Sequence, residues 1–248
     1  MEKCVLVTGS SNGIGKSIIK KFASCGYNVV INYNSDSKSA EELKKNVEKN
    51  YNVNAMVIKC DISKTLEVEQ MIKKITECFG KIDVLVNNAA IESNSDFFDK
   101  TEESFRKVLD VNVIGTFLVT KYVAKEMLKQ KSGVIINMTS NNAIDKFDPS
   151  TLEYDASKAA VISLTHNFAK EFAPFIRVNA VAPGWVETEK IKKIDDELDN
   201  QFIKSESKKN LLNRFATEED IANLVYFLSS DEASYINSEI IKIDGGSL

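Results

Sequence analysis

The chain has 248 residues, of which 43% are hydrophobic and 27% charged, so it holds enough apolar material for one large core. Its formal net charge is −4 at pH 7, which argues against the overall basic surface that nucleic-acid-binding proteins use to displace counterions from phosphates. We therefore expect one domain over residues 1–248 and no nucleic-acid partner.

The sequence shows no sign of a membrane span or of a leader. It has no apolar run of 18 residues, and its first residues pass directly into the strand-like segment CVLVTG without the apolar stretch of a signal peptide. Its four cysteines lie far apart without CxxC spacing, and His166 is the one imidazole available to a metal. We expect a cytoplasmic protein that binds no membrane, with reduced cysteines, no metal site and no role for His166.

Short β-branched runs alternate with longer amphipathic segments along the whole chain. This order is the pattern of βαβ units, in which helices cover both faces of parallel strands. The strand-like runs lie at 3–7, 28–33, 54–60, 82–87, 133–138, 176–182 and 239–244, and the helical segments reach to about residues 25, 49 and 79 and then span about 101–129, 153–173 and 218–228. We predict a single-domain Rossmann fold of the α/β class, with a doubly wound seven-stranded parallel sheet.

The segment 186–214 departs from this alternation. It is dense in charges of both signs, as in KIKKIDDELDNQFIKSESKKN, and it follows the carboxyl end of a predicted strand. Such a run is typical of a solvated helix. Its position also suits a mobile lid, since ligands of open α/β sheets bind at that edge. Both interpretations stay open.

A glycine-rich turn follows the first strand and precedes an amphipathic helix. It reads Thr8-Gly9-Ser10-Ser11-Asn12-Gly13-Ile14-Gly15. Gly9 can adopt turn geometry that a side chain would forbid, Gly13 lets the backbone approach a pyrophosphate, and Gly15 allows close packing of the helix on the sheet. The helix N-terminus adds free N–H groups and a positive dipole end. In this context the turn predicts a dinucleotide site.

The spacing of this turn, TGSSNGIG, resembles the TGxxxGxG motif of the short-chain dehydrogenase/reductase family. Further motifs of that family follow in the same order over nearly the whole chain. They are Asp61 after the third strand, in the place of the acid near the adenine; Asn87-Asn88-Ala89-Ala90, where the family has NNAG; Tyr154-Asp155-Ala156-Ser157-Lys158 as YxxxK; Pro183-Gly184; and Asp244-Gly245-Gly246. The resemblance implies an NAD(P)-dependent oxidoreductase that transfers a hydride between nicotinamide and a carbonyl or secondary alcohol.

The resemblance implies four catalytic residues, Asn112, Ser140, Tyr154 and Lys158. Tyr154 and Lys158 are four residues apart, which places them on one face of a helix, where an ammonium lowers the pKa of a neighbouring phenol. Ser140 ends a strand at the edge where ligands bind, with Thr139 as the alternative. Asn112 matches the asparagine that holds the lysine through a water. Each residue alone also has a structural explanation, such as a solvated Tyr–Lys pair or a loop-capping serine.

In the reducing direction, the resemblance implies that Tyr154 gives its proton to the carbonyl oxygen while hydride leaves the nicotinamide. Lys158 then lowers the pKa of the tyrosine and binds the nicotinamide ribose, and Ser140 polarises the carbonyl. Thr188 matches the family position that binds the carboxamide. The expected cofactor-binding residues are Gly9, Ser11, Asn12, Gly13, Ile14, Gly15, Tyr33, Asn34, Asp61, Ile62, Asn88, Ala89, Tyr154, Lys158, Pro183, Gly184, Val186 and Thr188.

The end of the second strand bears on the choice between NADP(H) and NAD(H). An enzyme built for NADH usually has Asp or Glu there, which binds the ribose 2′-hydroxyl and repels a 2′-phosphate. Tyr33 takes that place here and Asn34 follows, so we expect NADP(H) to be favoured over NAD(H). Asn12 stands where many NADPH enzymes have Arg or Lys, and Asp36 lies close to Lys38, the nearest base, so dual use stays open.

Several functions stay open within this resemblance. The pattern looks most like the bacterial 3-oxoacyl-[acyl-carrier-protein] reductases and the glucose dehydrogenases, so we expect a small carbonyl or alcohol substrate or an acyl thioester, with sugar or steroid dehydrogenase activity as the alternative. The segment IESNSDFF lacks the ITRD-type continuation of the acyl reductases, and the loop 141–153 indicates no substrate. A non-catalytic dinucleotide-binding sensor is the alternative of another class, because a fold alone does not imply activity.

Assembly is a further expectation from the resemblance. The helical segments at about 101–129 and 153–173 are similar to the two helices that pair across a two-fold axis in the family. We therefore expect a homotetramer.

Overall fold

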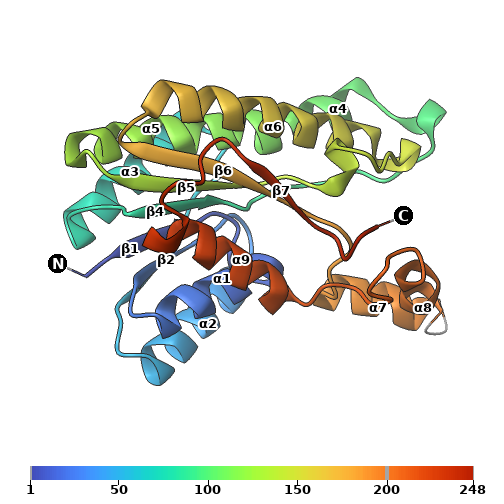
Figure 1. Cartoon of the computed structure of the whole chain (residues 1–248), viewed down its shortest axis with the longest axis horizontal. Helices are drawn as coiled ribbons and strands as arrows, with labels where there is room; N and C mark the ends of the chain where they lie inside the picture. Colours follow the sequence, from blue (N-terminus) through green and yellow to red (C-terminus); the bar gives the residue numbers. More distant parts are fainter. Residues whose placement is uncertain (1, 199–200, 248) are drawn as a thin grey trace.

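Among the residues that the structure describes, 2–198 and 201–247, seven parallel strands form one continuous sheet (Figure 1). In this computed structural model the strands are β1 Cys4–Val7, β2 Asn28–Tyr33, β3 Ala55–Lys59, β4 Val84–Asn87, β5 Gly133–Met138, β6 Ile176–Pro183 and β7 Ile240–Ile243. Their order along the sheet is β3-β2-β1-β4-β5-β6-β7. The predicted seven-stranded parallel sheet is confirmed. The order reverses between β1 and β4, the place where open α/β sheets bind ligands.

Helices cover both faces of the sheet, as the alternating sequence pattern predicts. They are α1 Gly13–Ser24, α2 Ser37–Asn50, α3 Thr65–Phe79, α4 Glu102–Leu109, α5 Thr116–Gln130, α6 Leu152–Phe172, α7 Glu189–Glu197, α8 Phe202–Ser207 and α9 Glu218–Ser229, with 3-10 turns η1 Phe97–Asp99, η3 Asn141–Ala143, η4 Pro149–Thr151 and η5 Asp231–Ala233. One face carries α1, α2 and α9, and the other carries α3, α5 and α6 (Figure 1). In the described part of the chain, no helix is both long and apolar enough to cross a membrane.

The stretch expected as one helical region over 101–129 has three parts. α4 and α5 are joined by η2, a π-helical segment Asp110–Gly115. Asn112 is buried in this segment, and its side chain bonds to residues outside the helix. At Gly115 a Cβ atom would lie 2.7 Å from the Ile62 side chain. The spacing of hydrophobic residues along the sequence does not reveal this wider turn. The π-helical segment coincides with tertiary contacts, and the hydrophobic spacing does not change there.

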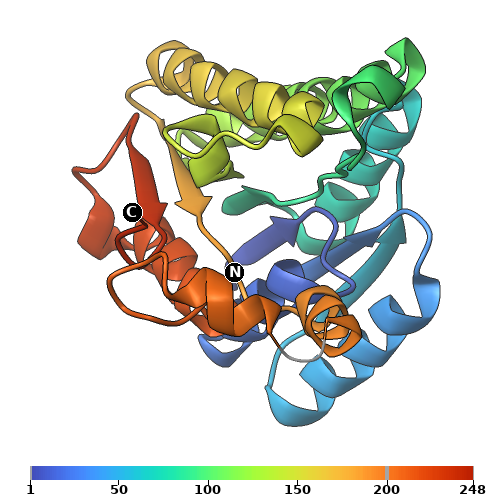
Figure 2. The same cartoon turned by 90° about the vertical axis from the view of Figure 1, so that its right-hand side faces the viewer.

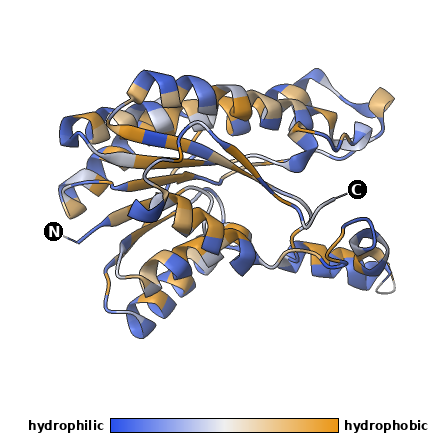
Figure 3. Cartoon of the chain, in the orientation of Figure 1, coloured by the Kyte–Doolittle hydropathy of each residue, from blue (hydrophilic) through white to orange (hydrophobic). Residues whose placement is uncertain are grey.

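The apolar strands explain why the sheet forms the core. Every residue of β1 and β4 is buried, because strands covered by helices on both faces read as continuous hydrophobic runs. The helices show the complementary pattern, with hydrophobic faces toward the sheet and hydrophilic faces outward (Figure 3). Phe22 of α1 and Val225 of α9 pack in the cluster on one face, and Met71 of α3 and Met127 of α5 in the cluster on the other.

On the face of the sheet that α5 and α6 cover, buried polar side chains form a row of hydrogen bonds from β4 to β5. Asn87 Nδ2 donates to Asn137 Oδ1 at 2.8 Å and to Thr120 Oγ1 of α5 at 2.9 Å. Asn137 Nδ2 donates in turn to Thr165 Oγ1 of α6 at 2.9 Å. All four side chains are buried, so breaking one of these bonds would leave a polar group without water or partner. We call these four residues the polar ladder.

Residues 189–198 and 201–209, which we call the arm, lie beyond the carboxyl ends of the strands (Figures 1 and 2). The arm contains α7 and α8, and positions 199 and 200 of the segment 186–214 lie outside the described residues. Aromatic rings fix its base. Trp185 stacks on Phe215 with 5.8 Å between centroids, and Phe202 meets Trp185 edge-on at 5.3 Å.

Candidate active site

Two adjoining cavities open at the carboxyl ends of the strands. One, of about 400 Å³, is lined by the glycine turn, and we call it the turn lobe. The other, of about 670 Å³, is lined by Tyr154 and by the arm, and we call it the tyrosine lobe. The two lobes form one crevice, because they share the lining residues Ile14, Asn88, Ala90 and Thr188.

The glycine turn between β1 and α1 has the conformation that its sequence predicts. Gly9 and Gly13 have φ angles of 59° and 55°, in the left-handed region that favours glycine. At Gly15 a Cβ atom would lie 2.8 Å from the main-chain oxygen of Gly9, so a side chain does not fit. The first N–H groups of α1 have no partners within the helix and can bind a phosphate. The predicted cofactor-binding residues that line the turn lobe are Gly9, Ser11, Asn12, Gly13, Ile14, Gly15, Asn34, Asp61, Ile62, Asn88, Ala89 and Thr188.

Side chains from the neighbouring strands brace this turn. Asn88 Nδ2 donates to the main-chain oxygens of Thr8 and Gly9, both at 2.9 Å, and Thr8 Oγ1 accepts the main-chain N–H of Asn88 at 3.0 Å. From β2, Asn32 Oδ1 accepts the N–H of Gly9 at 3.1 Å. The sequence analysis missed Asn32. A polar residue inside an apolar strand is the signal that could have found it, since buried amides need partners.

The end of β2 places its side chains on two sides. Asn32, Asn34 and Ser35 line the turn lobe, whereas Tyr33 packs against the apolar cluster on the α1 face of the sheet. Side chains alternate along a strand, so Tyr33 and its two neighbours in sequence face in opposite directions. Of the two positions expected to choose the cofactor, Asn34 is therefore the one that faces the crevice.

The carboxylates of Asp36 and Asp61 accept main-chain N–H groups and so fix two loops beside the turn lobe. The Asp36 carboxylate caps α2 by accepting the Ser39 N–H at 3.0 Å. Its hydrogen bonds to Ser39, and a further one to Asn12, lower the pKa of Asp36. Asp61, expected near the adenine, accepts the N–H and the hydroxyl of Ser63 at 3.0 and 2.7 Å and lines the lobe.

Tyr154 and Lys158 lie one turn apart on α6 and both line the tyrosine lobe. The ammonium nitrogen lies 5.4 Å from the centroid of the tyrosine ring and donates to the main-chain oxygen of Met138 at 2.7 Å. Burial lowers the pKa of Lys158 to about 8. Burial raises the pKa of the Tyr154 phenol, as does the Glu92 carboxylate, while a hydrogen bond with Ser140 lowers it. The pKa of the phenol is thus raised and not lowered, in contrast to the effect expected from Lys158, because burial has the largest influence. The tyrosine is therefore protonated at neutral pH and can donate a proton.

Ser140 follows β5 and lines the tyrosine lobe together with Tyr154, where its hydroxyl acts to lower the pKa of the phenol. Its Oγ also accepts the main-chain N–H of Asn142 at 3.2 Å. The hydroxyl of Thr139, the alternative, donates to the main-chain oxygen of Lys158 at 2.9 Å and so fastens α6 to β5. The geometry favours Ser140 over Thr139 as the group that meets a substrate oxygen.

The side chain of Asn112 connects segments of the site without bonding directly to Lys158. Asn112 Nδ2 donates to the Ile91 main-chain oxygen at 2.8 Å and to Ser157 Oγ at 2.9 Å, and its Oδ1 accepts the Ile91 N–H at 2.8 Å. Ser157 Oγ donates in turn to the main-chain oxygen of Tyr154 at 2.7 Å. The loop after β4 is thereby tied to the turn of α6 that carries the tyrosine. The expected water between Asn112 and Lys158 stays a prediction.

The two walls of the tyrosine lobe meet in an ion pair that sequence reasoning missed. On one wall, Glu92 follows β4, and on the other, Lys190 lies in the first turn of α7; the two side chains are paired, and both line the lobe. The partners are 98 residues apart, and neither segment has a pattern that predicts the other. The remaining predicted residues line the lobe beside this pair; they are Pro183, Gly184, Val186 and Thr188.

The crevice can hold a long ligand with a charged middle. The turn lobe offers main-chain N–H groups at a helix N-terminus, which suit a pyrophosphate, and the tyrosine lobe offers a proton donor at the far end. These residues fit a nicotinamide dinucleotide that spans both lobes, with a carbonyl compound beside it. Fold and site together define a nicotinamide-dependent oxidoreductase.

Comparison with known proteins gives the same class. Residues 9–247 match the family described as enoyl-(acyl carrier protein) reductase. The 3-oxoacyl-[acyl-carrier-protein] reductase FabG of Staphylococcus epidermidis is 40% identical over 247 residues, 99% of each chain, and the 3-oxoacyl-[acyl-carrier-protein] reductase of Synechocystis sp. is 39% identical over 243 residues, 97% of this chain and 95% of its own. The crystal structure of acetoin dehydrogenase YohF from Salmonella typhimurium matches with a TM-score of 0.88 and 34% identity, over 99% of this chain and 97% of that one.

The protein is therefore an NAD(P)-dependent oxidoreductase, as its motifs predict. It belongs to the short-chain dehydrogenase/reductase family.

Proposed function

We propose that the protein reduces 3-oxoacyl thioesters, presented on an acyl carrier protein, with NADPH as the preferred cofactor. The observation that carries this proposal is the group of Ser140, Tyr154 and Lys158 around one lobe that continues into the turn lobe. The substrate class is supported by the relatives named as 3-oxoacyl-[acyl-carrier-protein] reductases, which align over nearly their full length.

The reaction assigns a role to each polar group of the tyrosine lobe. The bound nicotinamide supplies the hydride. Ser140 and Tyr154 donate hydrogen bonds to the ketone oxygen, and Tyr154 gives up its proton as negative charge develops there. Lys158, when charged, stabilises the phenolate that remains. Asn112 does not touch the substrate. It acts through Ser157, whose hydrogen bond positions the turn of α6 that carries Tyr154.

The same residues would hold the cofactor. The glycine turn and the N-terminus of α1 would bind the pyrophosphate, and Asp61 and Ile62 would lie on the adenine side. Lys158 and Thr188 would bind the nicotinamide end.

The preference for NADPH rests on the neutral end of β2. Asn34 and Ser35 line the turn lobe, so no carboxylate at this place repels a 2′-phosphate. Asp36, the nearest acid along the sequence, is engaged with Ser39 and Asn12. No arginine or lysine occurs among the described residues that line the turn lobe, so the proposal is a preference with NADH as a second cofactor, and not exclusive use.

The arm and its base supply an apolar wall that an acyl chain could contact. Ile191, Ile194 and Phe202 of the arm line the tyrosine lobe, as does Trp185 at its base. We propose that the segment 186–214 is a lid that moves to admit the substrate. Its attachment to the opposite wall through Lys190 and Glu92 supports this role.

A small hydroxyketone is the second candidate substrate. The tyrosine lobe also carries Glu92, Asp148 and Glu206, which suit a polar compound. The similar YohF structure is that of an acetoin dehydrogenase. A non-catalytic sensor has less support, because it would not need the serine, tyrosine and lysine together in one lobe.

The deciding experiment measures oxidation of NADPH and of NADH with acetoacetyl-acyl carrier protein, acetoacetyl-coenzyme A, acetoin and a 3-ketosteroid. For glucose, which would be oxidised, it measures reduction of NADP+ and of NAD+. We expect kcat/KM for the carrier-bound thioester with NADPH to exceed the values for the other compounds by about tenfold or more. A higher value for acetoin would select the second candidate, and binding of cofactor without any turnover would select the sensor.

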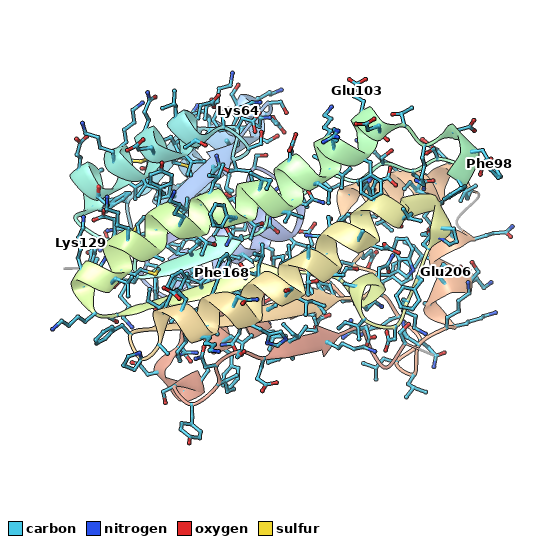
Figure 4. All side chains as sticks on the ribbon, turned by 90° about the horizontal axis from the view of Figure 1, so that it is seen from above. Lys64, Phe98, Glu103, Lys129, Phe168 and Glu206 are labelled. Carbon is cyan, nitrogen blue, oxygen red and sulfur yellow. The ribbon has the colours of Figure 1, made fainter. Side chains whose placement is uncertain are left out.

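We also propose that the protein assembles as a homotetramer through the helices expected to pair. α5 and α6 lie side by side (Figure 4). Ile114, Phe117 and Leu128 on the η2–α5 stretch are large apolar side chains with 45%, 40% and 39% of their surface exposed, and such patches mark protein contacts. Light scattering at micromolar concentration tests this, and a stable monomer would contradict it.

A further inference from the structure

Glu92 and Lys190 form an ion pair between the two walls of the tyrosine lobe, and both side chains line it. Glu92 comes from the loop after β4, and Lys190 from the arm. Both side chains are partly exposed, at 43% for Glu92 and 65% for Lys190, so solvent and a ligand in the lobe can reach them. Their charges therefore act on whatever enters.

Among the described residues that line this lobe, the other two acids, Glu206 and Asp148, each bond to a residue of their own segment. Glu206 pairs with Lys209 at 2.6 Å within the same part of the arm. Asp148 accepts the N–H and the hydroxyl of Ser150 at 2.9 and 2.6 Å. The pair of Glu92 and Lys190 differs from these because it spans the lobe, and opening the lobe separates its members.

Glu92 also lies on the reacting side of the lobe. It lines the same cavity as Ser140 and Tyr154, and its charge, after burial, contributes to the raised pKa of the tyrosine. A substrate whose ketone oxygen bonds to these two residues would place its adjoining groups within reach of the carboxylate. The charge of those groups then matters, because a carboxylate placed beside the Glu92 carboxylate is repelled by it, whereas an uncharged carbonyl is not.

We propose that Glu92 selects substrates by charge, so that the enzyme accepts neutral 3-oxoacyl esters and thioesters and rejects the free 3-oxo acids formed by their hydrolysis. Lys190 moderates this selection by neutralising part of the Glu92 charge. The inference rests on the proposed function, since it concerns the group next to the reduced ketone. In the free acid that group is a carboxylate, and in the thioester it is an uncharged carbonyl.

Two substitutions separate this role from that of a mechanical clasp. Both Glu92→Gln and Lys190→Gln break the ion pair and free the arm. Glu92→Gln removes the negative charge, whereas Lys190→Gln leaves that charge unopposed. Selection by charge therefore predicts changes of opposite sign in the two variants, while a clasp predicts changes of the same sign.

The experiment compares kcat/KM for ethyl acetoacetate and acetoacetate, which share the 3-oxobutanoyl group and differ in charge. We expect the ester-to-acid ratio to fall about tenfold in Glu92→Gln and to rise in Lys190→Gln. Lys192→Gln is the matched control, because Lys192 lies on α7 like Lys190, pairs with Glu187 just before that helix at 3.5 Å, and neither Lys192 nor Glu187 lines the lobe. Its ratio should equal that of the wild type.

The outcomes distinguish the inference from the proposed function. If the wild type reduces the ester and the two variants leave the ratio unchanged or move it in the same direction, the inference is overturned and the proposed function stands. If the wild type reduces no 3-oxo ester or thioester, the proposed function fails and the inference fails with it.

Discussion

The ammonium nitrogen of Lys158 donates a hydrogen bond of 2.7 Å to the main-chain oxygen of Met138, the last residue of the strand beside its helix. This cation is buried, and its pKa is lowered from 10.5 to about 8. A buried lysine whose charged form is disfavoured is a group whose presence opposes folding, even where, as proposed here, it serves the reaction.

The first prediction is that Lys158→Met stabilises the protein at neutral pH. Between about pH 8 and 10.5 the unfolded chain binds more protons at Lys158 than the folded protein, so the destabilising effect is full below that window and fades as pH rises through it. The free energy of unfolding should exceed that of the wild type by about 2 kcal/mol near pH 7, after loss of the bond to Met138 is included, and the gap should shrink toward pH 10. Urea unfolding of both proteins across this range measures it. A gap independent of pH would contradict the prediction.

Tyr154→Phe should lower kcat by about 100-fold or more, because it removes the proton donor and keeps the ring. The affinity for NADPH should change little. Steady-state kinetics and fluorescence titration with the cofactor measure the two effects. Tyr122→Phe, on α5 outside both lobes, serves as the control. Near wild-type turnover in Tyr154→Phe would remove the proposed role.

Asn112→Ala should reduce both stability and turnover. It deletes three hydrogen bonds to Ile91 and Ser157, at an expected loss of about 2 to 3 kcal/mol in the free energy of unfolding. Because Ser157 holds the Tyr154 turn, kcat should fall more than KM rises, and the pH profile of kcat should shift. Asn167→Ala is the control, since its amide bonds to Ser163 on the exposed side of α6. Loss of stability with unchanged kcat and pH profile would restrict Asn112 to a structural role.

Asn34→Asp should shift the cofactor preference toward NADH. The new carboxylate would face the turn lobe, where it can bind a ribose hydroxyl and repel a 2′-phosphate. We expect the ratio of kcat/KM for NADPH over NADH to fall about tenfold or more. Tyr33→Phe, at the neighbouring position that packs against the core, should leave the ratio unchanged. If the aspartate has no effect, cofactor choice is made elsewhere in the crevice.

Local signals in the sequence predict most of the fold. The seven strands and the glycine turn could be predicted because each depends on residues close together in the chain, such as the apolar run of β1 and the left-handed glycines at 9 and 13. The spacing of Tyr154 and Lys158 places both on one face of α6 for the same reason.

The features that could not be predicted from the sequence depend on contacts between side chains that lie far apart in the chain. The ion pair of Glu92 with Lys190 and the hydrogen bond from the Gly9 N–H to Asn32 join distant segments, and no local pattern predicts them. The π-helical segment around Asn112 likewise depends on contacts with the loop after β4 and with α6.

The polar ladder pairs Asn87 with Asn137 in the one register where their amides meet. A shift of β5 by one residue would turn Asn137 to the other face of the sheet and leave a buried amide unpaired. Asn88, which braces the glycine turn, follows Asn87, and Met138 and Ser140 follow Asn137 along the next strand. The ladder thus fixes β4 and β5 relative to each other, and with them the brace on the glycine turn and the serine of the tyrosine lobe. Changes confined to surface loops leave the spacing of these two parts of the crevice intact.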